Sequence, residues 1–140
     1  MPSQSKIYLD HAATTPLDGG VFNLMAPYFS GVFGNPSSQH FCGREAANAV
    51  TSARDKMAVA LGISPAELYF TGGGTEADNL GIKGIAQANA GRGRHIVVSA
   101  IEHPAVIESA LDARAYGVEV TFVNPDENGV ITPSAVADAM

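Results

Sequence analysis

Short apolar runs that alternate with helix-patterned segments constrain the fold of this chain more than any other feature. Three brief runs rich in β-branched and aromatic residues are typical of strands: Leu68–Thr71, Ile96–Val98 and Val118–Val123. Helical spacing of apolar residues follows the first two, over 75–88 and 103–115. Because parallel strands need a crossover connection, usually a helix, the pattern predicts an α/β fold of parallel βα units with helices on both faces of a sheet.

The N-terminal half of the sequence predicts helices without strands. Residues 1–20 are small and polar after a three-residue apolar run, which favours an N-terminal arm. One amphipathic helix is expected over Val21–Phe29, followed by a structured loop rich in Gly, Pro, Asn and Ser. A longer helix is expected over 46–61, ended by Gly62. Residues 21–140 are expected to form one domain, because 140 residues match the usual size of a single domain.

Two further helix starts are visible in the sequence. Ser64–Glu67 fits a short capped turn, and Thr132 with Pro133 fits the cap and first residue of a last helix. The sequence stops at Met140 inside that last expected helix, whose apolar face would then have little to pack against. We therefore expect the chain to be a fragment or a truncated product.

Composition excludes several classes of function. The chain has 8 basic and 14 acidic residues, a formal net charge of −6, which disfavours binding to nucleic acid or to an anionic membrane. No signal peptide and no run long enough to span a membrane is found. Cys42 is the only cysteine, so no internal disulfide can form and a reducing compartment is expected. We expect a soluble cytoplasmic protein.

The histidines and the cysteine do not suggest a metal site. His11, His40 and His95 form no pair with the i, i+4 spacing of a helical zinc site, and no second cysteine supports them. Cys42 stands at a helix entrance, where its thiol could be activated, but a lone cysteine is more often a small buried apolar residue. We expect no bound metal.

The most informative segment is the glycine turn FTGGGTEADN. Gly72–Gly74 would let an anion approach the backbone, and the positive end of the helix that follows would favour a phosphate. Thr75 could add its hydroxyl to the anion or cap the helix. The segment is neither a Walker A loop nor a dinucleotide fingerprint. An ordinary strand-to-helix turn with a capping threonine is the alternative.

His103 follows a predicted strand in SAIEHPAV, at the sheet edge where α/β proteins place ligands. It is therefore expected at the same edge as Thr75. A histidine there could stack on a planar ring, move a proton, or cap the helix that begins at Pro104. The local pattern leaves these roles open.

Five blocks of this sequence resemble the cysteine desulfurases, pyridoxal-phosphate enzymes of the class V aminotransferase type. They are IYLDHAATTP, FGNPSSQHFCGREA, LYFTGGGTEADNLGIKG, IVVSAIEHPAV and GVEVTFVNPDENGVI, in the family's order and spacing. The resemblance runs from Ile7 to Met140 and covers about the opening third of a family member. It implies part of the large domain of a type I pyridoxal-phosphate-dependent transferase, with an N-terminal arm.

The resemblance also implies roles for individual residues. Gly74 and Thr75 match the positions that hold the cofactor phosphate, and His103 matches the histidine that stacks on the pyridine ring and assists proton movement. Asn35 and the segment 12–14 match parts of the active-site surround.

This sequence departs from the family pattern at several positions. Gly72 stands where relatives commonly carry serine. None of the three lysines, Lys6, Lys56 and Lys83, lies in the Ser-x-His-Lys context of the Schiff-base lysine, and Cys42 does not align with the sulfur-accepting cysteine. The 140 residues are therefore expected to be inactive by themselves.

For function, the resemblance implies the transfer of sulfur from L-cysteine to other proteins. The family takes sulfur from L-cysteine, leaves L-alanine, and passes a persulfide to acceptor or scaffold proteins for iron–sulfur clusters or thiolated tRNA, as a homodimer. Two alternatives remain at this point. One is a selenocysteine lyase or another class V aminotransferase-like enzyme, and the other is a non-catalytic fragment that acts as an interaction module.

Overall fold

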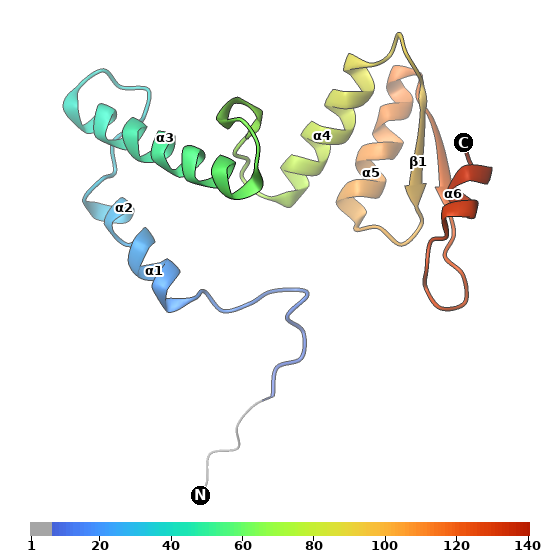
Figure 1. Ribbon diagram of the computed structural model, residues 1–140, viewed down its shortest axis with the longest axis horizontal. Helices are drawn as coiled ribbons and strands as arrows, with labels where there is room; N and C mark the ends of the chain where they lie inside the picture. Colours follow the sequence, from blue (N-terminus) through green and yellow to red (C-terminus); the bar gives the residue numbers. More distant parts are fainter. Residues whose placement is uncertain (1–6) are drawn as a thin grey trace, which may run out of the picture. The chain divides into compact units, whose positions relative to one another are not determined.

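The computed structural model describes residues 7–140. They fall into two compact units that divide after Leu68, and the second unit runs from Tyr69 to Met140. The described part of the first unit contains helices only, and both strands belong to the second unit (Figure 1).

Two short helices begin the first unit where one helix was predicted. Helix α1 spans Gly19–Met25 and helix α2 spans Pro27–Ser30. Pro27 has no amide hydrogen to donate to the preceding turn, so the helix predicted over Val21–Phe29 is interrupted at Ala26. Asp18 lies before the predicted range and extends α1 backwards, because its carboxylate accepts the Gly20 and Val21 amides at 2.8 and 3.1 Å.

The long helix α3 spans Phe41–Leu61 and confirms the prediction of a helix that ends before Gly62. Gly62 takes the left-handed conformation with φ 69°, which costs glycine little. His40 caps the other end through a 3.4 Å contact of its Nδ1 with the Gly43 amide. A Cβ at Gly43 would lie 2.1 Å from the Ser38 carbonyl oxygen, so only glycine lets the preceding loop pack on this helix.

The first unit closes on a short 3-10 helix, η1, at Pro65–Glu67. Ser64 and Glu67 form the predicted capping box, with the Ser64 amide donating to Glu67 at 2.8 Å. The Arg54 guanidinium of α3 donates to the Leu68 carbonyl oxygen and so connects the end of the unit to the long helix. Within residues 7–140, no helix, α3 included, has the length and hydropathy to cross a bilayer.

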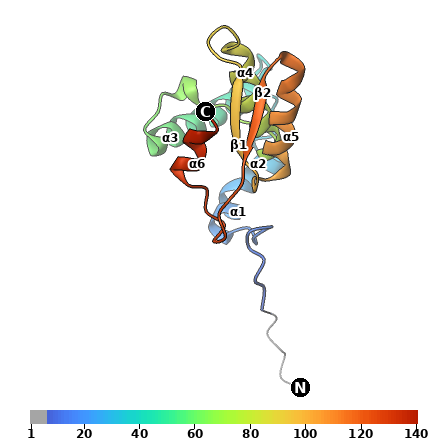
Figure 2. The ribbon, with the colours of Figure 1, turned by 90° about the vertical axis from the view of Figure 1, so that its right-hand side faces the viewer.

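The second unit is a parallel βαβ arrangement. Its elements are α4 (Gly74–Ala88), β1 (His95–Ser99), α5 (Pro104–Asp112), η2 (Ala113–Tyr116), β2 (Glu119–Val123) and α6 (Pro133–Asp138). The strands pair in parallel, with His95 opposite Glu119 and Ser99 opposite Val123. Helices α4 and α5 lie on one side of this sheet and α6 on the other (Figures 1 and 2). The predicted α/β class and the two later strands are confirmed.

The first of the three predicted strands, Leu68–Thr71, is not formed. Its apolar and aromatic residues suit a strand, but a strand needs a neighbour to share ladder hydrogen bonds. Among the described residues, the only sheet consists of β1 and β2, and neither pairs with this segment. The composition of this segment suits a strand, but composition alone does not produce a strand without a partner.

The core of the second unit lies between the sheet and α5. Val98, Val120 and Val118 pack with Ala110 and Ala113, and both alanines are 0 % exposed. The small alanine side chains let α5 approach the sheet closely. Ala110 and Ala113 thus form the part of this helical segment that faces the sheet. The helix itself is shorter than predicted, because it tightens into η2 at Ala113 and ends before Gly117, where φ is 77°.

One polar group in α5 is buried without a partner, and its removal should stabilise the protein. Ser109 is 1 % exposed and its Oγ has no hydrogen-bond partner. An unsatisfied buried hydroxyl costs about 1 kcal/mol or more. We expect Ser109→Ala to raise the free energy of unfolding by about 1 kcal/mol in a urea denaturation experiment.

Ser99→Ala is the matched control, because the Ser99 Oγ accepts the Ile101 amide at 3.3 Å. It should lower the free energy of unfolding by about 0.5–1 kcal/mol. Equal losses of stability in both variants would contradict the assignment of Ser109 as an unsatisfied group.

Candidate anion-binding turn at the start of helix α4

The glycine turn leads into α4 without a side-chain cap. The helix begins at Gly74, and its N-cap Gly73 has extended backbone angles, φ 165° and ψ 177°, and offers no side chain to the first turn. Thr75 is the second residue inside the helix and no side chain caps α4, so the alternative of a capping threonine is not found in the structure. A capping side chain would have to come from the N-cap position, which is Gly73, and glycine has no side chain.

Three backbone amides at this turn are free. The first helical bond runs from the Ala77 amide to the Gly73 carbonyl oxygen at 3.1 Å. The amides of Gly74, Thr75 and Glu76 have no acceptor among the described residues. An open recess of about 690 Å³ lies over them, lined by Gly72, Gly73, Gly74, Thr75, Glu76 and Asn79. Free amides at the positive end of a 15-residue helix suit an anion.

Polar side chains brace the turn. The Glu76 carboxylate accepts the Gly72 amide at 2.6 Å, the Asn79 side-chain amide donates to the Thr75 carbonyl oxygen at 2.8 Å, and the Thr71 hydroxyl donates to the Gly73 carbonyl oxygen at 3.1 Å. These roles were not predicted from the sequence. A glutamate three residues after the N-cap is the spacing of a capping box, which was the available signal for Glu76.

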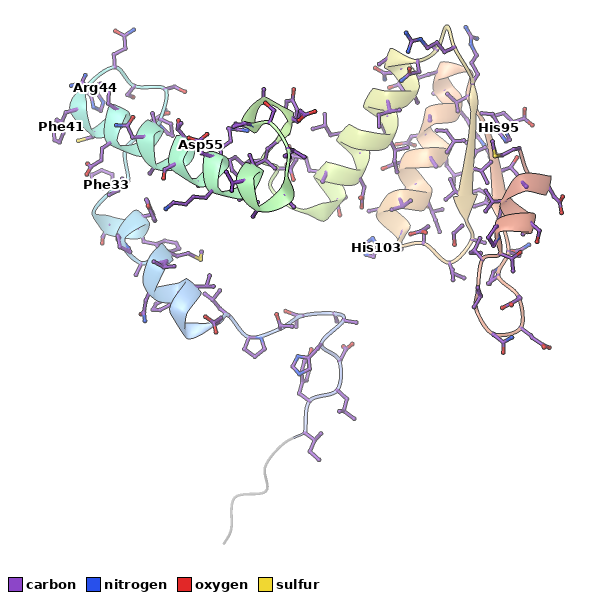
Figure 3. The ribbon with its side chains drawn as sticks, in the orientation of Figure 1. Phe33, Phe41, Arg44, Asp55, His95 and His103 are labelled. Carbon is purple, nitrogen blue, oxygen red and sulfur yellow. The ribbon has the colours of Figure 1, made fainter. Side chains whose placement is uncertain are left out.

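His103 forms the N-cap of α5. Its Nδ1 accepts the Ala105 amide at 3.1 Å, so the capping role considered from the sequence is present in the structure. A neutral ring whose Nδ1 accepts carries its proton on Nε2. The side chain is exposed at the start of α5 (Figure 3), which leaves Nε2 available to another group.

The turn and the histidine lie at the same end of the second unit. Helices α4 and α5 pack against each other, and both begin at the end of the sheet where β1 ends (Figure 1). Helix α4 leads into the start of β1 and α5 follows the end of β1, so both helices run opposite to the strand and begin at the same edge of the sheet. Thr75 and His103 are therefore brought to one edge, as the sequence predicted.

The other predicted residues make local contacts in the first unit. The Asn35 Oδ1 accepts the Ser37 amide at 2.9 Å, and the ring of His11 meets Tyr8 edge-on at 5.0 Å between centroids. In the segment 12–14, the Ala13 amide donates to the Asp10 carbonyl oxygen at 3.1 Å. Cys42, predicted to be buried, is half-buried near the start of α3. Among residues 7–140, no three metal-ligating side chains come together.

The parallel strands and the helices packed on them define the second unit as an α/β fold. The family model described as aminotransferase class-V matches residues 7–140, and the chain belongs to this family. The family is one of pyridoxal-phosphate-dependent enzymes.

Curated relatives are named as cysteine desulfurases. The chain is 46% identical over 135 residues to the putative cysteine desulfurase IscS 1 of Bacillus subtilis strain 168, which covers 96% of this chain and 36% of the relative. It is 45% identical over 137 residues to the cysteine desulfurase IscS of Azotobacter vinelandii, with 96% and 34% covered. The chain thus spans about a third of the length of these relatives.

Solved structures agree with this membership. A NifS-like protein superposes with a TM-score of 0.83 at 35% identity, over 91% of this chain and 35% of that protein. The structure of SspA in complex with cysteine gives a TM-score of 0.83 at 38% identity, over 95% of this chain and 38% of that one. The predicted fold, part of a type I pyridoxal-phosphate-dependent transferase, is confirmed.

Proposed function

We propose that these residues supply the phosphate cradle and the ring-stacking histidine of a pyridoxal-phosphate-dependent cysteine desulfurase. The observation that carries the proposal is the set of three free amides, of Gly74, Thr75 and Glu76, at the uncapped start of α4. Curated relatives with 43–46% identity are named cysteine desulfurases, which favours this activity over a selenocysteine lyase.

The residues at the turn fit the phosphate of the cofactor. A phosphate dianion needs several donors and a positive potential, and the free amides and the α4 dipole supply both. The Thr75 hydroxyl has no partner among the described residues and adds a further donor. Pyridoxal phosphate, when bound, supplies an electron sink for reactions at the α-carbon of an amino acid.

His103 would hold its ring by capping α5. The bond from the Ala105 amide to Nδ1 restricts the orientation of the imidazole and keeps the proton of the neutral ring on Nε2. A ring held in this way at the ligand edge of the sheet can cover a planar heterocycle and donate from Nε2. This restraint supports the roles that the family resemblance implies for His103.

The substrate and partners belong to the same proposal. L-cysteine is the proposed substrate, supported by the similarity to SspA, whose structure is described as a complex with cysteine. Sulfur-acceptor or scaffold proteins, a homodimeric state and a cytoplasmic location follow the family pattern, as does the division into an arm at 1–20 and a cofactor domain from 21 onwards. The 140 residues alone are proposed to be inactive, because none of the three lysines lies in a Ser-x-His-Lys context.

Removing the Thr75 hydroxyl tests the cradle. A hydrogen bond to a charged group contributes about 1.5–3 kcal/mol, so Thr75→Val should weaken binding of pyridoxal phosphate about ten-fold or more. The measurement is a titration followed by the amide resonances of Gly74, Thr75 and Glu76. Thr51→Val is the matched control, because Thr51 is an exposed residue of α3 in the first unit.

Pyridoxal without its phosphate separates the cradle from nonspecific binding. It should leave the three amide resonances unchanged at concentrations where the phosphorylated cofactor shifts them. The proposal fails if both compounds shift these amides equally, or if neither compound does.

A further inference from the structure

A carboxylate already occupies part of the turn that suits an anion. Glu76 is the third residue of α4, and its side chain folds back so that Oε2 accepts the Gly72 amide at 2.6 Å. Glu76 and Gly72 both line the recess over the free amides. The negatively charged carboxylate of Glu76 therefore lies at the recess where a phosphate would bind.

Gly72 makes room for this carboxylate. A Cβ at Gly72 would lie 3.0 Å from Oε2 of Glu76, closer than an ordinary contact, and no other atom would lie within 4 Å of it. The backbone does not require glycine here, because the glycines with left-handed φ are Gly62, Gly117 and Gly129. The only contact that a side chain at position 72 would disturb is thus the one with Glu76. Displacing that flexible carboxylate costs little.

We propose that Glu76 is a positioning residue that acts as an internal counter-anion of the turn and lowers its affinity for phosphate. This inference rests on the proposed function. With no anion bound, the carboxylate satisfies the Gly72 amide and offsets the positive end of α4. A bound phosphate must share that potential with Glu76 or displace it. Glycine at position 72 leaves room for the carboxylate, whereas a Cβ there would lie 3.0 Å from Oε2 and would make it shift.

The competition has a measurable size. A charged group at a helix end interacts with the dipole by about 0.3–1 kcal/mol, which corresponds to a change in affinity of about two- to five-fold. Glu76→Gln removes the charge and keeps the size of the side chain. We therefore expect it to bind phosphate about two- to five-fold more tightly than the unmodified chain.

The experiment is a titration of the 140-residue chain with inorganic phosphate, followed by the amide resonances of Gly74 and Thr75. Asp78→Asn is the matched control, because it removes the same charge two residues away without a hydrogen bond to the turn. It should change the affinity by less than half as much as Glu76→Gln. Far-UV circular dichroism confirms that each variant is folded.

Variants at Gly72 test the mechanism independently. Gly72→Ala adds a Cβ without a hydroxyl, so it should also tighten phosphate binding by crowding the carboxylate and weakening its hydrogen bond to the Gly72 amide. Glu76→Gln should then add less in the Gly72→Ala background than alone, because both changes act on the same competitor. Additive effects of the two substitutions would overturn the inference.

A ligand-free measurement completes the test. Hydrogen exchange at the Gly72 amide should be faster in Glu76→Ala than in Asp78→Ala, because only the first variant removes its acceptor. Equal exchange rates, or equal phosphate affinities of Glu76→Gln and the unmodified chain, overturn the inference and leave the cradle intact. If no variant binds phosphate, the proposed function fails, and the inference fails with it.

Discussion

Replacing Ala110 with aspartate should unfold the second unit. Ala110 is 0 % exposed, at the place where α5 packs on the sheet beside Val98 and Val120. Aspartate adds volume to a filled space and brings a carboxylate that has no polar partner in this apolar cluster. The combined cost should be at least about 3 kcal/mol, a large part of the stability of a small domain.

The measurement is urea denaturation followed by circular dichroism and by the amide resonances of β1 and β2. Ala115→Asp is the matched control, because the same substitution at an exposed position of η2 should change stability by less than about 0.5 kcal/mol. Retention of the β1 and β2 resonances in Ala110→Asp, with an unchanged denaturation midpoint, would show that the core does not lie where the structure places it.

The second large effect is the absence of catalysis by the 140 residues. Incubation with pyridoxal phosphate and L-cysteine should yield no sulfide and no alanine above the level of the cofactor in buffer. Treatment with borohydride should leave no covalent cofactor adduct on the chain. The reaction needs a lysine placed at the carbonyl carbon of the bound cofactor, and none of the three lysines lies in the Ser-x-His-Lys context of the family.

Lys83 is the lysine that shares a unit with the cradle. It stands eight residues after Thr75, about 12 Å farther along the axis of α4, at 1.5 Å per residue. Its ammonium pairs with Asp112 at 2.6 Å. Lys56 is an exposed residue of α3 in the first unit, and Lys6 lies outside the described residues. Within the second unit, the structure thus gives no lysine a position close to the turn.

Mass spectrometry of the borohydride-treated chain gives the readout. A Lys83→Arg variant serves as the control for slow nonspecific modification, and it should show the same low fraction of cofactor adduct as the original chain. A stoichiometric adduct that disappears in Lys83→Arg would contradict the prediction. It would show that Lys83 forms the Schiff base in place of the family lysine.

Much of this molecule follows from rules that act within a few residues. Gly62 ends α3 because glycine accepts the left-handed conformation, and Thr132 with Pro133 begins α6. The runs 96–98 and 118–123 form parallel strands because a helix separates them along the chain. The five family blocks also identify the fold and the glycine turn, because each block is a pattern of residues that are neighbours in the sequence.

The structure corrects the sequence analysis where the outcome depends on distant partners or on exact backbone angles. Leu68–Thr71 has the composition of a strand, but strand formation requires a neighbouring strand that the described residues do not offer. Thr75 has the right chemistry for a cap, but the N-cap position is Gly73, two residues before Thr75. The contact of Glu76 with Gly72 depends on the side-chain direction in the first turn of α4.

The sequence by itself determined the α/β class, most helix ends and the family, because periodicity, caps and motif spacing are properties of neighbouring residues. Only the tertiary structure decided which strands pair, which alanines are buried, and which amides of the turn stay free. These features depend on groups that are distant in the sequence and that the fold brings together. The free energy of bringing such groups together cannot be read from the residues of one short segment.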